Sequence, residues 1–222
     1  MSSCDWSSDV CSSDLDETTN RLKKFNQADY LGGGNNPASV GGACHMFSLA
    51  WLGEIVNDKS QGTESRIQAM ITKAPEIRMK YKAFSDRWSA EGGDRADEGM
   101  AKTYNVKIAN LSKYARAELV IDEVRQHNRT GFVYSFWFGA TSAHSIAVYQ
   151  SGSGRWYSGH IYVFEPNFGE YKMGKSFWAK WLMGFLYPFY TKSFGPIHAH
   201  QVRQVEKYAA PAVRFGRNVL NL

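Results

Sequence analysis

One cysteine of this chain stands where a thiol can become a nucleophile. Cys44 lies in the run GGACHMFSLAWL, between the Gly41-Gly42 pair and a continuous apolar segment. The unpaired N–H groups and the positive dipole end at a helix N-terminus stabilise a thiolate, and neighbouring glycines let backbone amides approach a developing oxyanion. The run therefore predicts a nucleophilic thiol at the start of a helix. A buried cysteine that only fills space is the alternative.

A thiol nucleophile needs a base beside the sulfur and a third group that holds the ring of the base, and these residues commonly lie far apart in sequence. His144 opens the predicted strand HSIAVY, and Glu165 ends the next predicted strand, IYVFEP. Alone, each has a structural explanation, the first as a satisfied, half-buried histidine and the second as a solvent-facing carboxylate. Together, the order Cys44, His144, Glu165 at a helix start, a strand start and a strand end predicts a catalytic triad.

Nearby asparagines leave two roles open. Asn167 could orient the imidazole in place of Glu165. An oxyanion hole would combine the Cys44 N–H with a side-chain amide from the preceding loop, for which Asn36 or Asn35 is available. His45 follows Cys44 by about 100° around the helix axis, so we expect it to point away from the sulfur and to be structural.

The elements that must position these residues divide the chain into two halves. Apolar residues from Met46 to Val56 cover most of a helix circumference and predict a central buried helix that ends near Asn57. Residues 16–40 are expected to form a loop. Further helices are predicted at 63–87, with an interruption at Pro75, and at 97–104 and 116–127.

The second half is aromatic and β-branched. Strands are predicted at 132–139, 144–152, 160–166 and 196–205, and an aromatic helix at 177–187 is expected to end before Pro188. Helices first and an antiparallel sheet second describe an α+β, papain-like fold, with the nucleophile on a central helix of the N-terminal half. We expect one catalytic domain over residues 16–222.

Three stretches of the chain resemble a known family. GGACHMFSLAWL, AHSIAVY and VFEPNFGEY are similar to the YopT-type cysteine proteases of bacterial effectors, and the resemblance covers most of residues 41–171. It implies that Cys44 is the nucleophile, that His144 is the general base and acid, and that Glu165 stands where the family typically has Asp. It also implies secretion into a host cell, cleavage of a host signalling protein such as a membrane-bound small GTPase, and processing of the enzyme's own N-terminal region.

The first fifteen residues differ in composition from the rest of the chain. Residues 5–15, DWSSDVCSSDL, resemble one reading frame of a common sequencing adapter, so residues 1–15 are expected to be non-native. Without Cys4 and Cys11, Cys44 is the one remaining cysteine, which disfavours a secreted disulfide scaffold. Without the three aspartates of this segment the formal net charge rises from +5 to +8, which favours an acidic partner surface, anionic lipid or nucleic acid without choosing among them.

These patterns support three functions. The first is a cysteine endopeptidase. The second is a deamidase, transglutaminase or acyltransferase that uses the same triad, because a thioester intermediate can be resolved by water or by an amine. The third is a binding module with an idle site, for which Glu165 in place of Asp is the supporting feature.

The partners expected from the sequence are few. We expect a protein substrate, no nucleic acid, a peripheral contact with an anionic membrane surface, a monomer, and no cofactor. His160, His198 and His200 could imitate a zinc site, but no cysteine or carboxylate cluster completes it. Since no apolar run reaches the roughly 18 residues of a membrane-spanning helix, none is predicted.

Overall fold

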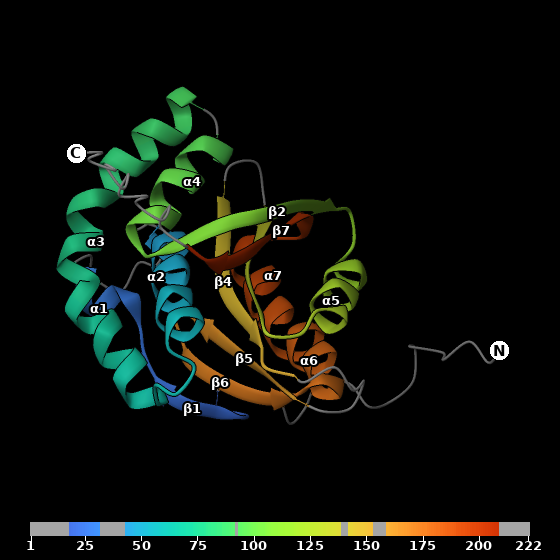
Figure 1. The fold of residues 1–222 in the computed structure, drawn as a ribbon. Coiled ribbons are helices and arrows are strands. Elements are labelled where there is room, and N and C mark those ends of the chain that lie inside the picture. The colour runs from blue at the N-terminus through green and yellow to red at the C-terminus, as the bar shows by residue number, and fades with distance from the viewer. Residues whose placement is uncertain (1–17, 32–42, 92, 139–141, 153–158, 209–222) are drawn as a thin grey trace, which may run out of the picture.

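A seven-stranded antiparallel sheet carries helices on both of its faces (Figure 1). The computed structural model describes residues 18–31, 43–91, 93–138, 142–152 and 159–208. The strand order is β1-β6-β5-β4-β3-β7-β2. The strands are β1 (Arg21–Lys24), β2 (Val106–Tyr114), β3 (Thr130–Phe138), β4 (Ser142–Gln150), β5 (His160–Glu165), β6 (Gly169–Gly174) and β7 (Ile197–Lys207).

The first face of the sheet, as we call it, lies under the helices of the first half of the chain. These are α1 (Gln27–Leu31), α2 (Ala43–Asn57), α3 (Thr63–Glu91) and α4 (Gly93–Thr103). Twelve of the fifteen residues of α2 are buried, because its apolar residues surround the helix and both α3 and the sheet pack against it. The predicted central buried helix ending at Asn57 is therefore confirmed.

Small residues let α2 approach its neighbours closely. A Cβ atom on Gly53 would lie 2.5 Å from the carbonyl oxygen of Tyr104, which follows α4. A Cβ atom on Gly131 of β3 would lie 2.9 Å from Leu52 Cδ2. The helix that carries Cys44 is thus held against α4 and β3 at contact distance.

A buried ion pair joins α2, α3 and β6. The Arg66 guanidinium contacts the Glu170 carboxylate, and both side chains are almost fully buried. Trp51 Nε1 and Thr63 Oγ1 each donate to Glu170 at 2.8 Å, so the remaining lone pairs of the carboxylate are used. A buried charge pair is tolerated when its other hydrogen bonds are made, and this one fixes α2 and α3 over the sheet.

The second face of the sheet lies under the helices of the second half of the chain. They are α5 (Ala117–Gln126), α6 (Lys175–Trp181), the π-helix η2 (Leu182–Leu186) and α7 (Tyr187–Phe194), which Figure 1 shows on the side opposite α2 and α3. Alternation along the strands divides the two cores. Ala147 and Tyr149 of β4 belong to the first-face core, whereas Ile146 and Val148 belong to the second-face core.

The α+β, papain-like fold class is confirmed, but several predicted boundaries were wrong. Helix α3 continues through Pro75, because buried residues on both sides of the proline, including Ala74 and Ile77, hold the helix in the core. The aromatic segment likewise continues through Pro188, which sits in the first turn of α7, where the missing N–H costs little.

The predicted loop at 16–40 was also wrong in part, since its described residues include β1 and α1. Strands β2 and β6 were missed because short or half-exposed strands give a weak alternation signal. The predicted last strand is β7. The adapter-like segment lies outside the described residues. None of the helices in the described ranges is both long enough and apolar enough to cross a membrane.

Candidate active site

Three side chains from three elements meet at one end of the sheet. Cys44 is the second residue of α2, His144 the third residue of β4, and Glu165 the last residue of β5. Strands β4 and β5 pair from Gln150–Ile161 to Ala147–Phe164, so Glu165 lies one residue and His144 three residues beyond the last pair. All three side chains are at least 95% buried. The structure therefore brings together the three residues that the sequence proposed as a triad.

The imidazole of His144 bridges the thiol and the carboxylate. Its Nε2 contacts Glu165 Oε1, which leaves Nδ1 for the hydrogen bond to Cys44. The backbone N–H of Ser145 also donates to the Cys44 sulfur. The sulfur is thus held by two donors from consecutive residues of β4.

These contacts change both pKa values in the direction that forms an ion pair. Burial raises the pKa of the Cys44 thiol, but the His144 charge, the His144 hydrogen bond and the Ser145 N–H together bring it below its usual value. Burial lowers the pKa of His144, but the negative charges of Cys44 and Glu165 raise it to about 10. Both shifts favour the thiolate and the imidazolium, and the thiolate is the nucleophilic form of a cysteine.

A tyrosine that the sequence analysis missed completes the ring's surroundings. Tyr190 of α7 stacks on His144 with ring centroids 4.6 Å apart, and its hydroxyl lies 2.9 Å from His144 Nε2. The same hydroxyl donates to Glu165 Oε1 at 2.8 Å. Burial and the Glu165 charge raise the pKa of Tyr190 well above its usual value, so it remains a neutral donor. In the sequence Tyr190 is one aromatic among many, and no spacing rule links it to His144.

Asn167 acts on the imidazole through its neighbours. Its backbone N–H donates to Glu165 Oε2 at 2.8 Å, and its side-chain Nδ2 donates to the Tyr190 hydroxyl at 2.8 Å. Of the two candidates for orienting His144, it is Glu165 that contacts the ring. Asn167 instead fixes the carboxylate and the tyrosine.

The N-terminal segment supports this turn from outside. Gln27 Nε2 donates to Asn167 Oδ1 at 2.8 Å, and Gln27 N–H donates to the Pro166 carbonyl at 2.7 Å. Strand β1, a few residues earlier, pairs with β6. Residues 21–27 therefore hold the turn that carries Glu165 and Asn167.

The start of α2 can supply oxyanion donors. The first four N–H groups of a helix have no intrahelical acceptor, and Cys44 is among these positions. A backbone amide beside the nucleophile is a recurrent oxyanion donor. Asn36, Asn35 and the Gly41-Gly42 pair lie outside the described residues.

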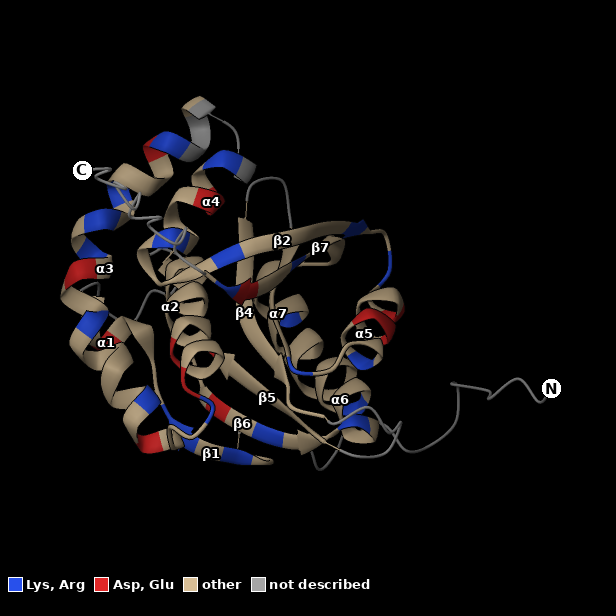
Figure 2. Ribbon diagram, viewed as in Figure 1, with Lys and Arg blue, Asp and Glu red and all other residues tan. Residues whose placement is uncertain are grey.

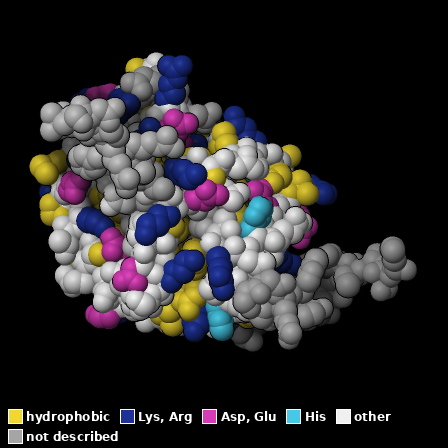
Figure 3. Space-filling model, in the orientation of Figure 1, with side chains coloured by type: hydrophobic (Ala, Val, Ile, Leu, Met, Phe, Trp, Pro, Cys, Tyr) yellow, Lys and Arg dark blue, Asp and Glu magenta, His cyan; other side chains and the backbone are white. Residues whose placement is uncertain are grey.

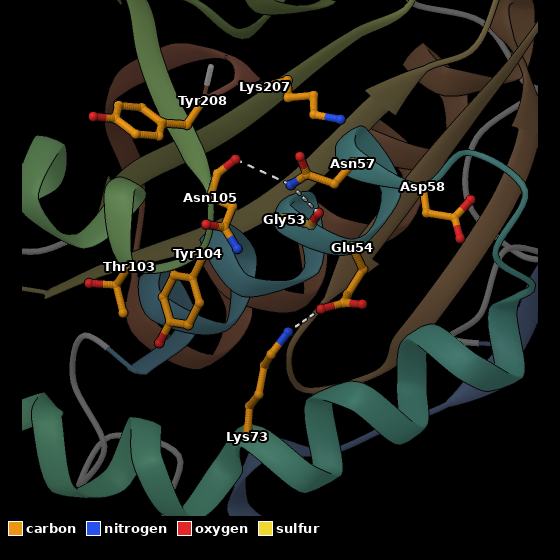
Figure 4. Close-up of a pocket in the computed structure, with 10 residues that line it drawn as sticks. All are labelled: Gly53, Glu54, Asn57, Asp58, Lys73, Thr103, Tyr104, Asn105, Lys207 and Tyr208. Atoms are coloured by element: carbon orange, nitrogen blue, oxygen red, sulfur yellow. Dashed lines mark hydrogen bonds and ion pairs between the residues drawn. The ribbon is translucent and has the colours of Figure 1, made fainter. Parts of the chain in front are cut away.

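A polar cavity of about 510 Å³ lies away from this site, near the C-terminal end of α2 (Figure 4). Gly53, Glu54, Asn57 and Asp58 line one side of it, and Glu54 pairs with Lys73 of α3. Gly53 is nine residues from Cys44, which is about 14 Å along a helix. Cys44, His144 and Glu165 are not among the residues that line the cavity.

The described surface mixes charges of both signs. Figure 2 shows Lys and Arg along α3 and β1 with acidic residues between them, and on the face in Figure 3 the two signs are interspersed. Among the described residues there is no group of three or more His, Cys, Asp or Glu that could hold a metal ion. His200 instead lies 2.8 Å from the Tyr134 hydroxyl, inside the second-face core.

Comparison with known proteins gives a likeness at the level of fold. The structure is similar to the crystal structure of the Pseudomonas avirulence protein AvrPphB, with a TM-score of 0.64 and 15% sequence identity. The match covers 86% of this chain and 99% of that chain. No protein-family model and no curated protein sequence matches the chain.

Proposed function

We propose that this chain is a cysteine endopeptidase of the YopT type, with residues 16–222 as its catalytic domain. The observation that carries the proposal is the buried Cys44–His144 pair with Glu165 on the far nitrogen of the ring. The pKa of Cys44 is lowered and that of His144 is raised to about 10, as thiolate chemistry requires.

The reaction follows from this arrangement. The Cys44 thiolate attacks the peptide carbonyl carbon, and the oxyanion that forms accepts hydrogen bonds from N–H groups at the start of α2. The His144 imidazolium gives its proton to the amine as the C–N bond breaks, which leaves a thioester. Neutral His144 then takes a proton from water, whose oxygen attacks the thioester and releases the acid and the thiolate.

Glu165 and Tyr190 keep the ring productive during these steps. The carboxylate stabilises the imidazolium and fixes the tautomer in which Nδ1 faces the sulfur, as the acidic member of a triad does. Tyr190 stacks on the ring and donates to the same carboxylate oxygen. We assign Asn167 to the support of these two side chains.

The proposed substrate is a host signalling protein, reached after bacterial secretion into the host cell. The resemblance of residues 41–171 to YopT-type effectors and the fold likeness to a bacterial avirulence protein support this class. A membrane-bound small GTPase fits the resemblance, and a net charge of +5, or +8 without residues 1–15, suits an anionic membrane surface.

The first test is the pH dependence of iodoacetamide alkylation at Cys44 in the full chain, followed by mass spectrometry of the peptide that carries it. Cys4 and Cys11 serve as reference thiols in the same sample. We expect Cys44 to react as a thiolate well below pH 8, and His144→Ala to lose this reactivity. An ordinary thiol profile in the parent would contradict the proposal and favour the binding module.

A second measurement separates the endopeptidase from transferases that use the same triad. Candidate host proteins are incubated with the parent and with Cys44→Ala, and the products are weighed by mass spectrometry. Peptide hydrolysis gives fragments, whereas deamidation changes an intact substrate by about 1 Da as nitrogen is exchanged for oxygen. An intact substrate with a changed mass would replace the endopeptidase by the transferase class.

A further inference from the structure

A second series of buried polar contacts lies beside the Cys44–His144 pair. It is made by the next residue of α2 and the next residue of β4. His45 of α2 lies next to Cys44, and Ser145 of β4 lies next to His144. His45 Nδ1 is 3.2 Å from Ser145 Oγ, and Ser145 Oγ is 2.8 Å from Ser135 Oγ of β3. The same two elements are therefore joined twice, once by the thiol and the imidazole and once by His45 and Ser145.

The far side of His45 is anchored by a buried ion pair. His45 Nε2 lies 2.8 Å from Asp97 Oδ1 of α4, and Asp97 Oδ2 contacts Arg203 Nε of β7. Phe84 of α3 stacks on the His45 ring with centroids 5.7 Å apart. His45, Asp97 and Arg203 are each at most 5% exposed. Four elements thus converge on one histidine that the proposed reaction does not use.

The chemistry of the partners sets the direction of the hydrogen bonds. A carboxylate only accepts, so the His45 nitrogen beside Asp97 carries the hydrogen. In that tautomer Nδ1 is an acceptor, and the Ser145 hydroxyl donates to it. The Ser145 oxygen is then available to accept from Ser135.

Ser145 connects His45 to the Cys44 sulfur, because it contacts both residues. Its backbone N–H donates to Cys44, and its carbonyl accepts from Ser48 Oγ of α2 at 3.2 Å. Its side chain is bound by His45. All three polar groups of Ser145 therefore engage α2, so the bond between His45 and the Ser145 hydroxyl helps to fix where the Ser145 N–H lies relative to the sulfur.

We infer that His45 is a positioning residue for the Cys44 thiolate, acting through Ser145. The inference deepens the proposed function, since it assumes that Cys44 works as a thiolate. A buried ion pair is weak evidence for stability by itself, because well-packed apolar residues often stabilise as much. Here the pair anchors His45, which contacts Ser145, and these two residues lie one position from Cys44 and His144. The pair can therefore affect where the thiolate lies.

The charged and titratable groups around Cys44 are known, so a change in its titration can be assigned. His144 and the Ser145 N–H lower the pKa of the thiol, whereas Glu165 raises it. Cys44 in turn raises the pKa of Tyr190 and of Tyr81 from α3. His45 acts on the sulfur only by way of Ser145 in this scheme.

Substitutions that separate the two polar contacts of His45 test the inference in the full chain. His45→Gln places an N–H donor near the Nε2 position and loses the acceptor for Ser145, whereas His45→Asn keeps an acceptor near the Nδ1 position. Ser145→Ala removes only the hydroxyl. Val124→Ala in the second-face core is the matched control for lost stability, since Val124 is fully buried away from this chain of contacts.

The readouts are the midpoint pH of Cys44 alkylation and the melting temperature. We expect His45→Gln and Ser145→Ala to raise the midpoint by up to about one pH unit, the upper bound being full loss of the Ser145 N–H bond to the thiolate. His45→Asn should keep the parent midpoint despite a lower melting temperature. Val124→Ala should lower the melting temperature only.

Two outcomes would overturn the inference. The first is an unchanged midpoint in Ser145→Ala and His45→Gln, which would make the contacts purely structural. The second is an equal shift in His45→Asn and His45→Gln, which would exclude the route through Ser145. If His45→Gln does not fold, Ser145→Ala decides alone. An ordinary thiol profile in the parent contradicts the proposed function instead, so the two failures are distinguishable.

Discussion

The two faces of the sheet contribute different kinds of groups to the candidate site. The first face contributes a thiol and backbone amides, carried by a helix in which twelve of fifteen residues are buried. The second face contributes His144, Glu165 and Tyr190, which lie among aromatic rings and bond to one another.

This difference shows two ways of fixing a reactive group. Close packing around α2 fixes the position of the proposed nucleophile, because a crowded core leaves a helix little freedom to move. Hydrogen bonds around His144 fix the orientation of the proposed base, because a buried polar group is held by its partners. We therefore expect loss of the thiol to remove the reaction, and changes to the groups that surround His144 to weaken it by degrees.

The largest effect is expected from the first face, with Cys44→Ala. Loss of the nucleophile should reduce peptide hydrolysis by at least about 10⁴-fold, since the remaining groups cannot form a thioester. The melting temperature should change little, because one sulfur atom is removed. Steady-state hydrolysis and thermal melting of the two proteins check this. Hydrolysis that survives would mean that the first face does not hold the nucleophile.

The second face should respond next, with Glu165→Gln. Removing the carboxylate charge removes one of the causes that raise the pKa of His144 to about 10, so the alkaline limb of the kcat/KM profile should move to lower pH. We expect kcat/KM at neutral pH to fall about 100-fold. Glu165→Asp keeps the charge but withdraws it by about 1.5 Å, one bond length. Its kcat/KM should therefore lie between those of the parent and Glu165→Gln. An unchanged alkaline limb in Glu165→Gln would argue against this role.

A smaller loss is expected for Tyr190→Phe, which keeps the ring stacked on His144 but removes the hydroxyl. A loss of about tenfold in kcat/KM corresponds to one hydrogen bond that helps to hold the carboxylate. Tyr187→Phe is the matched control, because its hydroxyl also lies on the second face but contacts Tyr134 and His200. Equal losses in both variants would point to general loosening of the aromatic core.

The smallest effect is on stability and concerns His200. Burial lowers its pKa from 6.5, so the unfolded chain binds a proton below pH 6.5 that the folded chain does not. The stability present above pH 6.5 is therefore lost as the pH falls through the folded-state pKa. We expect the melting temperature to drop between pH 6.5 and 5.5 by about 2 °C more in the parent than in His200→Gln. His144 is present in both proteins, so its own contribution to the pH dependence cancels in this comparison.

The difference between the faces also explains what the sequence could predict. Cys44 was found from a local signal, a Gly-Gly pair followed by an all-round apolar helix. His144 and Glu165 were found from their places at strand ends. Each of these signals lies within a few residues of the side chain that it identifies, which is the range over which periodicity and turn chemistry act.

Tyr190 and His45 depend on tertiary neighbours, and the sequence patterns did not indicate their contacts. Tyr190 meets His144 only because α7 packs on the second face, 46 residues along the chain. His45 was expected to be structural, and its contact with Asp97 depends on where α4 crosses α2. Propensity failed in a similar way at Pro75, where burial in the core outweighed the local preference for a break.

The position of β7 affects how the chain reaches this structure. It is the last strand of the described residues, yet it lies between β3 and β2, so β2 lacks its described neighbour until residues 197–207 have been synthesised. Strand β1 likewise waits for β6, about 150 residues later. Contacts of such high sequence separation slow folding, because loop closure must come first. A nascent chain on the ribosome therefore lacks its complete sheet until residues 197–207 have emerged. Residues 21–27 likewise cannot support the turn after Glu165 until that turn has emerged.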